Sequence, residues 1–202
     1  MKCYWNVKPR KKKLPVMDKT FYTLLVYSEN IAGLLNQITA VFTRRQLNIE
    51  SLNVSASSIP GVHKYTITTW SDHDTIEKVV KQIEKKIDVL QAHFFTDDEI
   101  FLHEVALYKL STPELQGDPN VSKIIRKHNA SIVDINAVYS IVKKTGMTEE
   151  IISLYNELQK SGCLLQYVRS GRVAITRGSA ERVNDFLESR HESYLKEKGI
   201  KA

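Results

Sequence analysis

The sequence contains only two cysteines, Cys3 and Cys163, which lie far apart in a chain of 202 residues. No Cys/His spacing in it is typical of a metal site, and two distant thiols do not indicate a disulfide framework. So few thiols fit a reducing compartment, and we expect a cytoplasmic protein. The sequence also lacks an apolar run of signal-peptide length and any stretch near the roughly 20 apolar residues that span a bilayer. Neither secretion nor membrane association is therefore expected.

Catalytic and nucleotide-binding motifs are missing as well, since no GxSxG, P-loop, GxGxxG or HExxH pattern occurs. The adjacent pair His103 and Glu104 lies in a predicted strand, where neighbouring side chains point to opposite faces and do not readily share a metal ion or a proton. The acidic run at residues 97–99 is interpreted as a solvated linker rather than a cation site. We therefore expect no catalytic residue and no metal site, although a small enzyme with an unfamiliar site stays open as a third hypothesis.

Positive charge is concentrated at the N-terminus. Residues 1–20 hold seven of the 29 lysines and arginines but only one of the 23 acids, which accounts for the whole net charge of +6. The rest of the chain is neutral, so its domains lack the basic surface typical of a nucleic-acid-binding domain. Residues 10–13 have the charge to bind an acidic partner, but the interpretation we favour for residues 1–20 is a flexible basic leader.

The stretch after the leader predicts a strand, a loop, a helix and the start of a second strand. Residues 21–27 are rich in aromatic and β-branched side chains, which favour a strand, and residues 28–30 interrupt it with turn and cap residues. From Ile31 onward, apolar residues recur at helical spacing. Leu47 begins the next strand.

Residues 51–95 complete this unit. Two alternating stretches within residues 51–70 are separated by turn residues and predict a hairpin. Asp74, followed three places later by Glu77, resembles a capping box that opens a second helix. A strand at residues 89–95 closes the unit, and the resulting order β-α-β-β-α-β is the ferredoxin-like arrangement.

The remaining residues are predicted to repeat this element order loosely, without being a sequence repeat. The predicted elements are a strand at 100–110, a helix at 121–128, a long strand or two joined by a bend at 131–142, a helix capped by Thr148 that stops at Gly162, and short strands at 164–169 and 172–177. A last helix is predicted from Ala180 to about Lys198, with Val183, Phe186 and Leu187 on its inner face. The predicted fold class is α+β, with two consecutive ferredoxin-like domains at residues 21–97 and 98–178 and a C-terminal helix within residues 179–202.

The loop between the first strand and the first helix has the chemistry of a binding site. The first amides of a helix have no internal partner and carry the positive end of its dipole, so a carboxylate can dock there. Gly33 has no Cβ and permits close approach of a ligand, and Asn48, at the start of the next strand, offers an amide that donates and accepts. From the local pattern alone, an ordinary turn with Asn30 as the helix cap stays the simpler interpretation.

The same strand order also occurs in RRM domains, which bind RNA. Those domains need stacking aromatics within a pattern such as K/R-G-F/Y-G/A-F-V-x-F/Y. Residues 63–70 carry one or two aromatics and none of that pattern, and Tyr65 is better explained as a core residue. We therefore expect no nucleic-acid partner.

Three segments resemble a known family. Residues 27–35, YSENIAGLL, are similar to an E-N-x-x-G-x-L stretch, residues 47–52, LNIESL, to N-I-E-S-L, and residues 168–178, VRSGRVAITRG, to a later R-S-G and R-G signature. All three occur, in this order, in the family of small regulatory subunits of acetolactate synthase (acetohydroxyacid synthase). The likeness covers residues 21–178.

The resemblance implies that residues 21–97 form an ACT domain, an amino-acid-sensing module that pairs with a second copy to give a homodimer. It implies an effector that lies between the loop of one copy and the strand start of the other, with its carboxylate on the amides of residues 31–33. The effector is expected to be valine, or else leucine or isoleucine. The implied effector-binding residues are Asn30, Ile31, Ala32, Gly33, Leu34, Leu35, Asn48 and Ile49.

The resemblance further implies a non-catalytic regulatory subunit of acetolactate synthase, which activates a catalytic large subunit and mediates its feedback inhibition in branched-chain amino acid biosynthesis. Thiamine diphosphate, magnesium and FAD are expected on that partner, and no cofactor in this chain. Residues 98–178 are expected to contact the catalytic subunit through exposed apolar positions of residues 133–142. The alternative is a free-standing ACT-domain sensor that regulates another enzyme or transcription, which the lack of a flanking helix-turn-helix disfavours.

Overall fold

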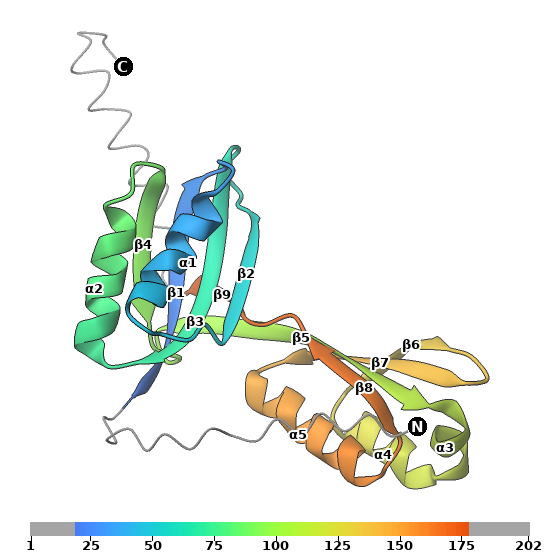
Figure 1. The fold of residues 1–202 in the computed structure, drawn as a ribbon. Helices are drawn as coiled ribbons and strands as arrows, with labels where there is room; N and C mark the ends of the chain where they lie inside the picture. Colours follow the sequence, from blue (N-terminus) through green and yellow to red (C-terminus); the bar gives the residue numbers. More distant parts are fainter. Residues whose placement is uncertain (1–18, 178–202) are drawn as a thin grey trace, which may run out of the picture.

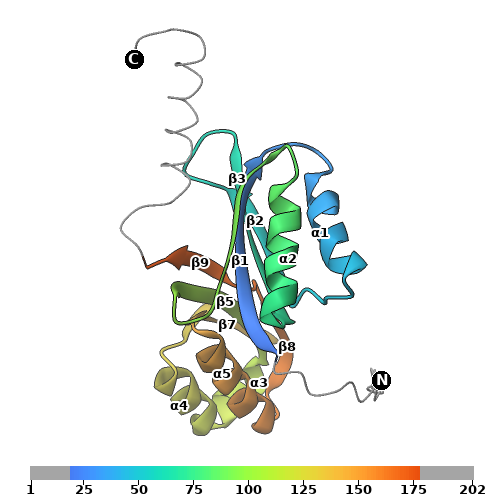
Figure 2. The same cartoon turned by 90° about the vertical axis from the view of Figure 1, so that its left-hand side faces the viewer.

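The structure is a computed structural model that describes residues 19–177. The predicted basic leader, apart from its last two residues, and the predicted C-terminal helix therefore lie outside the described residues. Within residues 19–177 the chain forms two antiparallel sheets, each with helices on one face (Figures 1 and 2). The α+β class with two ferredoxin-like units is thus confirmed.

The first unit has the predicted element order. Its sheet has the strand order β2-β3-β1-β4, and every neighbouring pair is antiparallel. Its elements are β1 (Thr20–Glu29), α1 (Leu34–Arg44), β2 (Ser51–Ala56), β3 (Val62–Ser71), α2 (His73–Glu84) and β4 (Val89–Phe95). Alternate residues of β1 point to opposite faces, so Leu24 and Val26 pack under the two helices while Leu25 and Tyr27 enter a second core on the other face.

Two helix starts in this unit differ from the sequence prediction. Helix α1 begins at Leu34 rather than at Ile31, because Gly33 adopts a left-handed conformation with φ of 87° and ends a turn before the helix. Helix α2 is capped by Asp72, whose carboxylate accepts a hydrogen bond of 2.8 Å from the Thr75 amide. The predicted capping box that began at Asp74 is therefore wrong by two residues, since Asp74 already lies in the first turn.

The second unit repeats the order of the first. Its main sheet has the strand order β6-β7-β5-β8, which corresponds position by position to β2-β3-β1-β4. Its elements are β5 (Ile100–Ser111), α3 (Thr112–Gly117), α4 (Pro119–Lys127), β6 (Ser131–Ile135), β7 (Tyr139–Gly146), α5 (Thr148–Lys160), β8 (Leu164–Arg169) and β9 (Val173–Thr176). Buried side chains of α4 and α5 pack against Tyr108, Leu110 and Val142 of this sheet.

Two further local predictions are settled by this unit. Of the two alternatives for residues 131–142, the structure shows two strands, which pair as a hairpin. The side chain of Asn136 closes its turn by accepting from the amides of Val138 and Tyr139 at 2.9 Å each. Thr148 is not the cap of α5. Met147 takes the cap position and its amide donates to the Glu150 carboxylate at 3.1 Å, whereas the Thr148 hydroxyl donates to Glu104 at 2.6 Å.

Strand β5 joins the two units, because it is 12 residues long and takes part in both. Its first half pairs with β9, and its second half forms the centre of the second sheet. Ile100 and Leu102 in the first half pack with Ala174 of β9 against the first sheet, on the face opposite α1 and α2. The first sheet is therefore covered on both faces. Part of this cover, Ile100 and Leu102, lies beyond the domain boundary that we expected at residue 98.

Candidate functional site

The loop between β1 and α1 is held in place by backbone hydrogen bonds at its start. The amide of Glu29 donates to the carbonyl of Asp88 at 2.9 Å, and the amide of Asn30 donates to the carbonyl of Gly61 at 3.1 Å. The loop therefore rests on the tip of the β2–β3 hairpin on one side and on the start of β4 on the other. Residues 30–33, which we call the α1 loop, follow this anchored point.

The start of α1 carries amides without acceptors. The first hydrogen bond that closes the helix runs from the Gln37 amide to the Gly33 carbonyl at 3.3 Å. Gly33 occupies the cap position and offers no side-chain hydrogen bond, and the first turn contains no acidic residue. The interpretation of Asn30 as the helix cap is therefore wrong. Within residues 19–177, acceptors are lacking for the amides of Ala32, Gly33, Leu35 and Asn36.

These amides lie at an open surface. Asn30, Ile31, Ala32 and Leu35 are exposed, and the fractional exposure of Ile31 is 44%. A Cβ built on Gly33 would meet nothing within 4 Å, so the space beside this residue is free for a ligand. Glycine is needed here because of the positive φ of this position, and not because a side chain would clash. An uncompensated helix N-terminus with free amides attracts a carboxylate.

Leu34 has a different position from the other predicted site residues. Its side chain is fully buried in the core under α1 and α2. It therefore fixes the first turn of the helix against the sheet, while the neighbouring Leu35 presents its side chain to solvent.

Asn48 and Ile49 lie at the opposite end of the first unit from the α1 loop. Asn48 is exposed, and its carbonyl accepts a hydrogen bond of 2.7 Å from the Thr69 hydroxyl. Asn30 contacts Gly61 at one end of β3, and Asn48 contacts Thr69 near its other end. Eight residues of strand, or about 27 Å, separate these two contacts. The β1–α1 and α1–β2 connections lie at opposite ends of α1 (Figure 1). One copy of the chain therefore does not bring Asn30 and Asn48 together, and a site that contains both needs a second copy.

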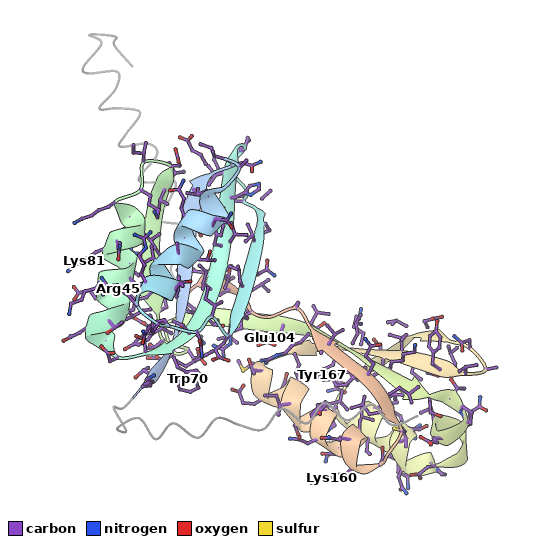
Figure 3. All side chains as sticks on the ribbon, viewed as in Figure 1. Arg45, Trp70, Lys81, Glu104, Lys160 and Tyr167 are labelled. Carbon is purple, nitrogen blue, oxygen red and sulfur yellow. The ribbon has the colours of Figure 1, made fainter. Side chains whose placement is uncertain are left out.

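A second polar feature, which sequence reasoning missed, lies where the two units meet. Arg172 is 5% exposed, and its guanidinium donates to the Asp97 carboxylate at 2.6 Å and to the Thr148 hydroxyl at 3.3 Å. Glu104 is 2% exposed and accepts from Thr148 at 2.6 Å and from Arg169 at 3.4 Å. We call these five residues the junction cluster. Glu104 is labelled at this position in Figure 3.

The junction cluster connects the two units through the turn between β8 and β9. The Arg172 guanidinium lies 4.5 Å from the ring centroid of Phe21, which belongs to β1. At Gly171, φ is 77° and an added Cβ would lie 2.8 Å from the Ser51 Cβ of β2, so only glycine allows this close approach. A cavity of about 350 Å³ borders the cluster and is walled by Phe21, Trp70 and Ile152.

The junction cluster explains parts of the sequence that were assigned differently or not at all. Asp97 was interpreted as part of a solvated linker. Residues 97–99 are indeed exposed, but Asp97 also forms an ion pair with a buried arginine, which that interpretation did not include. Arg172 lies 75 residues from Asp97 along the chain, so no local spacing could reveal the pair. The alternation of β5 was a usable signal, because it predicts Glu104 on the inner face of a strand with apolar neighbours.

The described residues 19–177 contain no group of three His, Cys, Asp or Glu side chains that could hold a metal ion. In the same part of the chain, no helix is both long enough and apolar enough to cross a membrane.

Comparisons with known proteins match both units. Residues 24–91 match the family described as the AHAS small subunit-like ACT domain, and residues 103–178 match the family described as the small subunit of acetolactate synthase. A Bacillus subtilis protein named acetolactate synthase small subunit is 33% identical over 168 residues, which cover 82% of this chain and 95% of that protein. A protein of the same name from Buchnera aphidicola is 30% identical over 155 residues, covering 77% of this chain and 98% of that protein.

A solved structure supports the fold of the whole described region. The acetolactate synthase small subunit from Thermotoga maritima aligns with a TM-score of 0.71 at 23% identity, covering 79% of this chain and 99% of that chain. Both the α1 loop and the turn at Gly171 fall inside the matched family ranges.

Proposed function

Because the chain belongs to the family of acetolactate synthase small subunits, we propose that it is the regulatory, non-catalytic subunit of a cytoplasmic acetolactate synthase. In this proposal it binds a catalytic large subunit, raises its activity and transmits feedback inhibition by a branched-chain amino acid. The kinship with proteins of that name supports the role of a small subunit. Thiamine diphosphate, magnesium and FAD belong to the catalytic partner in this scheme, and this chain contributes none of them.

The observation that carries the sensing role is the open start of α1. A free amino acid is a zwitterion, and its carboxylate needs hydrogen-bond donors with a positive local potential. The unpaired amides of the α1 loop and the first helical turn supply both. The exposed side chains of Ile31 and Leu35 flank these amides and offer apolar contact to an aliphatic side chain such as that of valine.

The proposed site is completed by a second copy of the chain. Asn48 lies too far from its own α1 loop to reach the same ligand, but it is exposed and its backbone is anchored to Thr69. A homodimer that sets the α1 loop of one copy beside Asn48 and Ile49 of the other would enclose the effector between the copies. Effector binding then favours one arrangement of the dimer, and couplings of this kind are typically about 1–3 kcal/mol.

The β6–β7 hairpin is the proposed contact surface for the catalytic subunit. Ile132, Val133, Ile135 and Val138 are between 46% and 71% exposed and lie on adjoining positions of this hairpin. Exposed apolar side chains that gather in this way are typical of protein–protein contact surfaces.

The decisive experiment uses the reconstituted pair of this chain and its catalytic subunit, titrated with valine, leucine and isoleucine. We expect Gly33→Asp to abolish inhibition while activation of the catalytic subunit persists, because the new carboxylate repels that of the effector. Gly33→Asn is the matched control, since asparagine has the same shape without the charge and also tolerates a positive φ. Full sensitivity to the effector in Gly33→Asp would show that the α1 loop is not the site.

The contribution of the second copy is tested separately by calorimetry. We expect Asn48→Ala to weaken binding of the effector about tenfold, in keeping with the loss of a hydrogen bond to a charged group. Asn53→Ala, on β2 of the same unit, is the control. An unchanged affinity in Asn48→Ala would remove this residue from the site and leave the role of the α1 loop intact.

A further inference from the structure

The end of β3 lies between Asn48 and the junction cluster. Thr68 and Thr69 are neighbours on this strand, and successive residues of a strand point to opposite faces of the sheet. Thr69 lies opposite Tyr22 and points toward α1 and α2, whereas Thr68 points to the other face and lines the cavity beside the junction cluster. Both side chains are at most 1% exposed, so each hydroxyl needs a partner inside the fold.

The hydroxyl of Thr69 holds the segment that presents Asn48. This segment, residues 47–50, connects α1 to β2, and backbone hydrogen bonds of 3.0 and 2.8 Å hold the amides of Leu47 and Glu50 at its two ends. Between them, the Thr69 hydroxyl donates to the Asn48 carbonyl at 2.7 Å. Of these three hydrogen bonds, only that of Thr69 comes from a side chain, so a substitution can remove it without changing the backbone.

This hydrogen bond controls the direction in which Asn48 points. Leu47 and Ile49 pack partly buried side chains against the core, while Asn48 between them is exposed. The Asn48 carbonyl and the Ile49 amide belong to one planar peptide group, so holding the carbonyl holds the whole group. The side chain that we propose to contact an effector on a second copy is therefore held through its backbone by Thr69.

Thr68 ties the same segment to the second unit. Its hydroxyl shares a hydrogen bond of 2.6 Å with that of Ser51, which begins β2 three residues after Asn48. The Ser51 side chain lies against the turn between β8 and β9, where a Cβ added to Gly171 would be 2.8 Å from it. Arg172 of the junction cluster is the next residue of that turn. A displacement of the segment would therefore reach the junction through Ser51.

We propose that the end of β3 links effector binding in the first unit to the second unit. Thr69 positions Asn48 for the effector, and Thr68 positions Ser51 against the turn that carries Arg172. Neither threonine touches the effector, so both are positioning residues. This inference rests on the proposed effector site, and it adds how occupation of that site reaches the unit that we propose to contact the catalytic subunit.

Replacing each threonine in turn by valine removes its hydroxyl and keeps its shape. The variants are studied in the full-length chain, reconstituted with its catalytic subunit and titrated with valine, leucine and isoleucine. We expect Thr69→Val to raise the effector concentration for half-maximal inhibition about fivefold, with the maximal inhibition unchanged. Thr69→Ser keeps the hydroxyl and should restore the wild-type value.

Thr68→Val is the matched variant on the other face of the strand. It removes a hydrogen bond of similar length and burial that does not involve Asn48. We expect the half-maximal concentration to stay at the wild-type value and the residual activity at saturating effector to rise about twofold, because Ser51 is no longer held against Gly171. The two variants thus separate effector affinity from its transmission.

A double variant tests whether Thr69 acts through Asn48. If it does, adding Thr69→Val to Asn48→Ala should weaken effector binding little further, because the amide that Thr69 positions is already absent. Losses that add fully would show that Thr69 acts on the effector by another route, which would overturn its assignment.

The remaining outcomes distinguish this inference from the function on which it rests. If none of the three amino acids inhibits the wild-type pair, the proposed function fails and the inference fails with it. If inhibition is present and Asn48→Ala weakens it, but both threonine variants behave as the wild type, the effector site stands and the role of β3 is wrong. Equal effects of Thr68→Val and Thr69→Val would show that the two hydroxyls only stabilise the sheet, which also overturns the proposal.

Discussion

The two units have the same strand order but differ in the connection between their first strand and first helix. In the first unit the chain makes a turn through Gly33 and leaves amides of α1 exposed. In the second unit β5 runs directly into α3, and the Thr112 hydroxyl shares a buried hydrogen bond of 2.8 Å with Ser140. The sheet therefore does not determine where a ligand binds. The units differ in the loop that follows the first strand, and it is the loop of the first unit that we propose as the effector site.

The edges of the two sheets differ in a complementary way. The β2–β3 edge of the first sheet carries polar residues such as Asn53 and Ser55, whereas the equivalent β6–β7 hairpin exposes Ile135 and Val138. The edge of the first sheet is thus polar, and the hairpin of the second unit presents apolar surface that suits a protein. This contrast leads to three predictions, which concern the junction of the units, their edges and their helix caps.

The largest expected effect follows from breaking the junction cluster. Arg172→Ala would remove one of the two cations beside the buried Glu104 carboxylate and would leave Asp97 without its ion-pair partner. Removing one partner of a buried ion pair typically costs about 3–5 kcal/mol. We expect a decrease of about 3 kcal/mol in the free energy of unfolding, because Asp97 remains partly exposed. Urea unfolding followed by circular dichroism measures this change.

Two control variants test whether the loss of stability comes from the buried guanidinium of Arg172. Arg169 is 37% exposed, so Arg169→Ala is expected to cost less than about 1 kcal/mol. Arg172→Lys keeps the charge but loses the planar fork that reaches both Thr148 and Asp97, so its cost should be intermediate. If Arg172→Ala and Arg169→Ala were equally mild, the cluster would not join the two units.

The second prediction concerns the apolar hairpin. Ile135→Asp places a charge on a surface that we propose to be buried against the catalytic subunit, where a well-packed apolar contact is worth about 1–3 kcal/mol. We expect the affinity of the two subunits, measured by biolayer interferometry, to fall about tenfold or more. Asp134→Asn on the same strand is the control and should change the affinity little. Unchanged affinity in Ile135→Asp would place the contact elsewhere.

Features of the fold that depend on neighbouring residues could be predicted from the sequence, and features that depend on residues far apart in the sequence could not. The alternation of β1 and the helical spacing after Ile31 are encoded in neighbouring residues, so both elements were predicted. The position of the α1 loop was predicted for the same reason, but its cap was not, because the left-handed turn at Gly33 moves the helix start by three residues. Glu104 and Arg172 meet only after folding, and their pairing required the structure.

The participation of β5 in both units also lay beyond the sequence pattern. Its 12 residues alternate regularly from Ile100 to Ser111, and nothing in that alternation shows that the first half leaves the second sheet to cover the first. The switch depends on β9, which follows β8 after the turn at Gly171 and pairs with the other half of β5. Predicting that β5 belongs to both units requires knowing how β8 and β9 divide the length of β5 between them.

The smallest expected effect compares the caps of the equivalent helices α2 and α5. Asp72 accepts from the Thr75 amide at 2.8 Å, whereas Glu150 accepts from the Met147 amide at 3.1 Å. An aspartate cap is worth about 1 kcal/mol, so Asp72→Ala should lower the free energy of unfolding by about that amount. We expect Glu150→Ala to cost about half as much, because Glu150 accepts a hydrogen bond from the amide of the cap residue Met147 but is not itself the cap residue.

The pH dependence separates the charge of Asp72 from its hydrogen bond. The hydrogen bond from the Thr75 amide lowers the pKa of Asp72 below its usual 3.8. A lowered pKa means that the folded state favours the carboxylate, so this stabilisation is full above the unfolded pKa and is lost as the pH falls through the folded value. The difference between the wild type and Asp72→Asn, measured by thermal unfolding, should therefore shrink as the pH is lowered from neutral to below 3.8. A difference that stayed constant with pH would show that the helix dipole and the charge of Asp72 do not contribute, and that the neutral hydrogen bond alone caps α2.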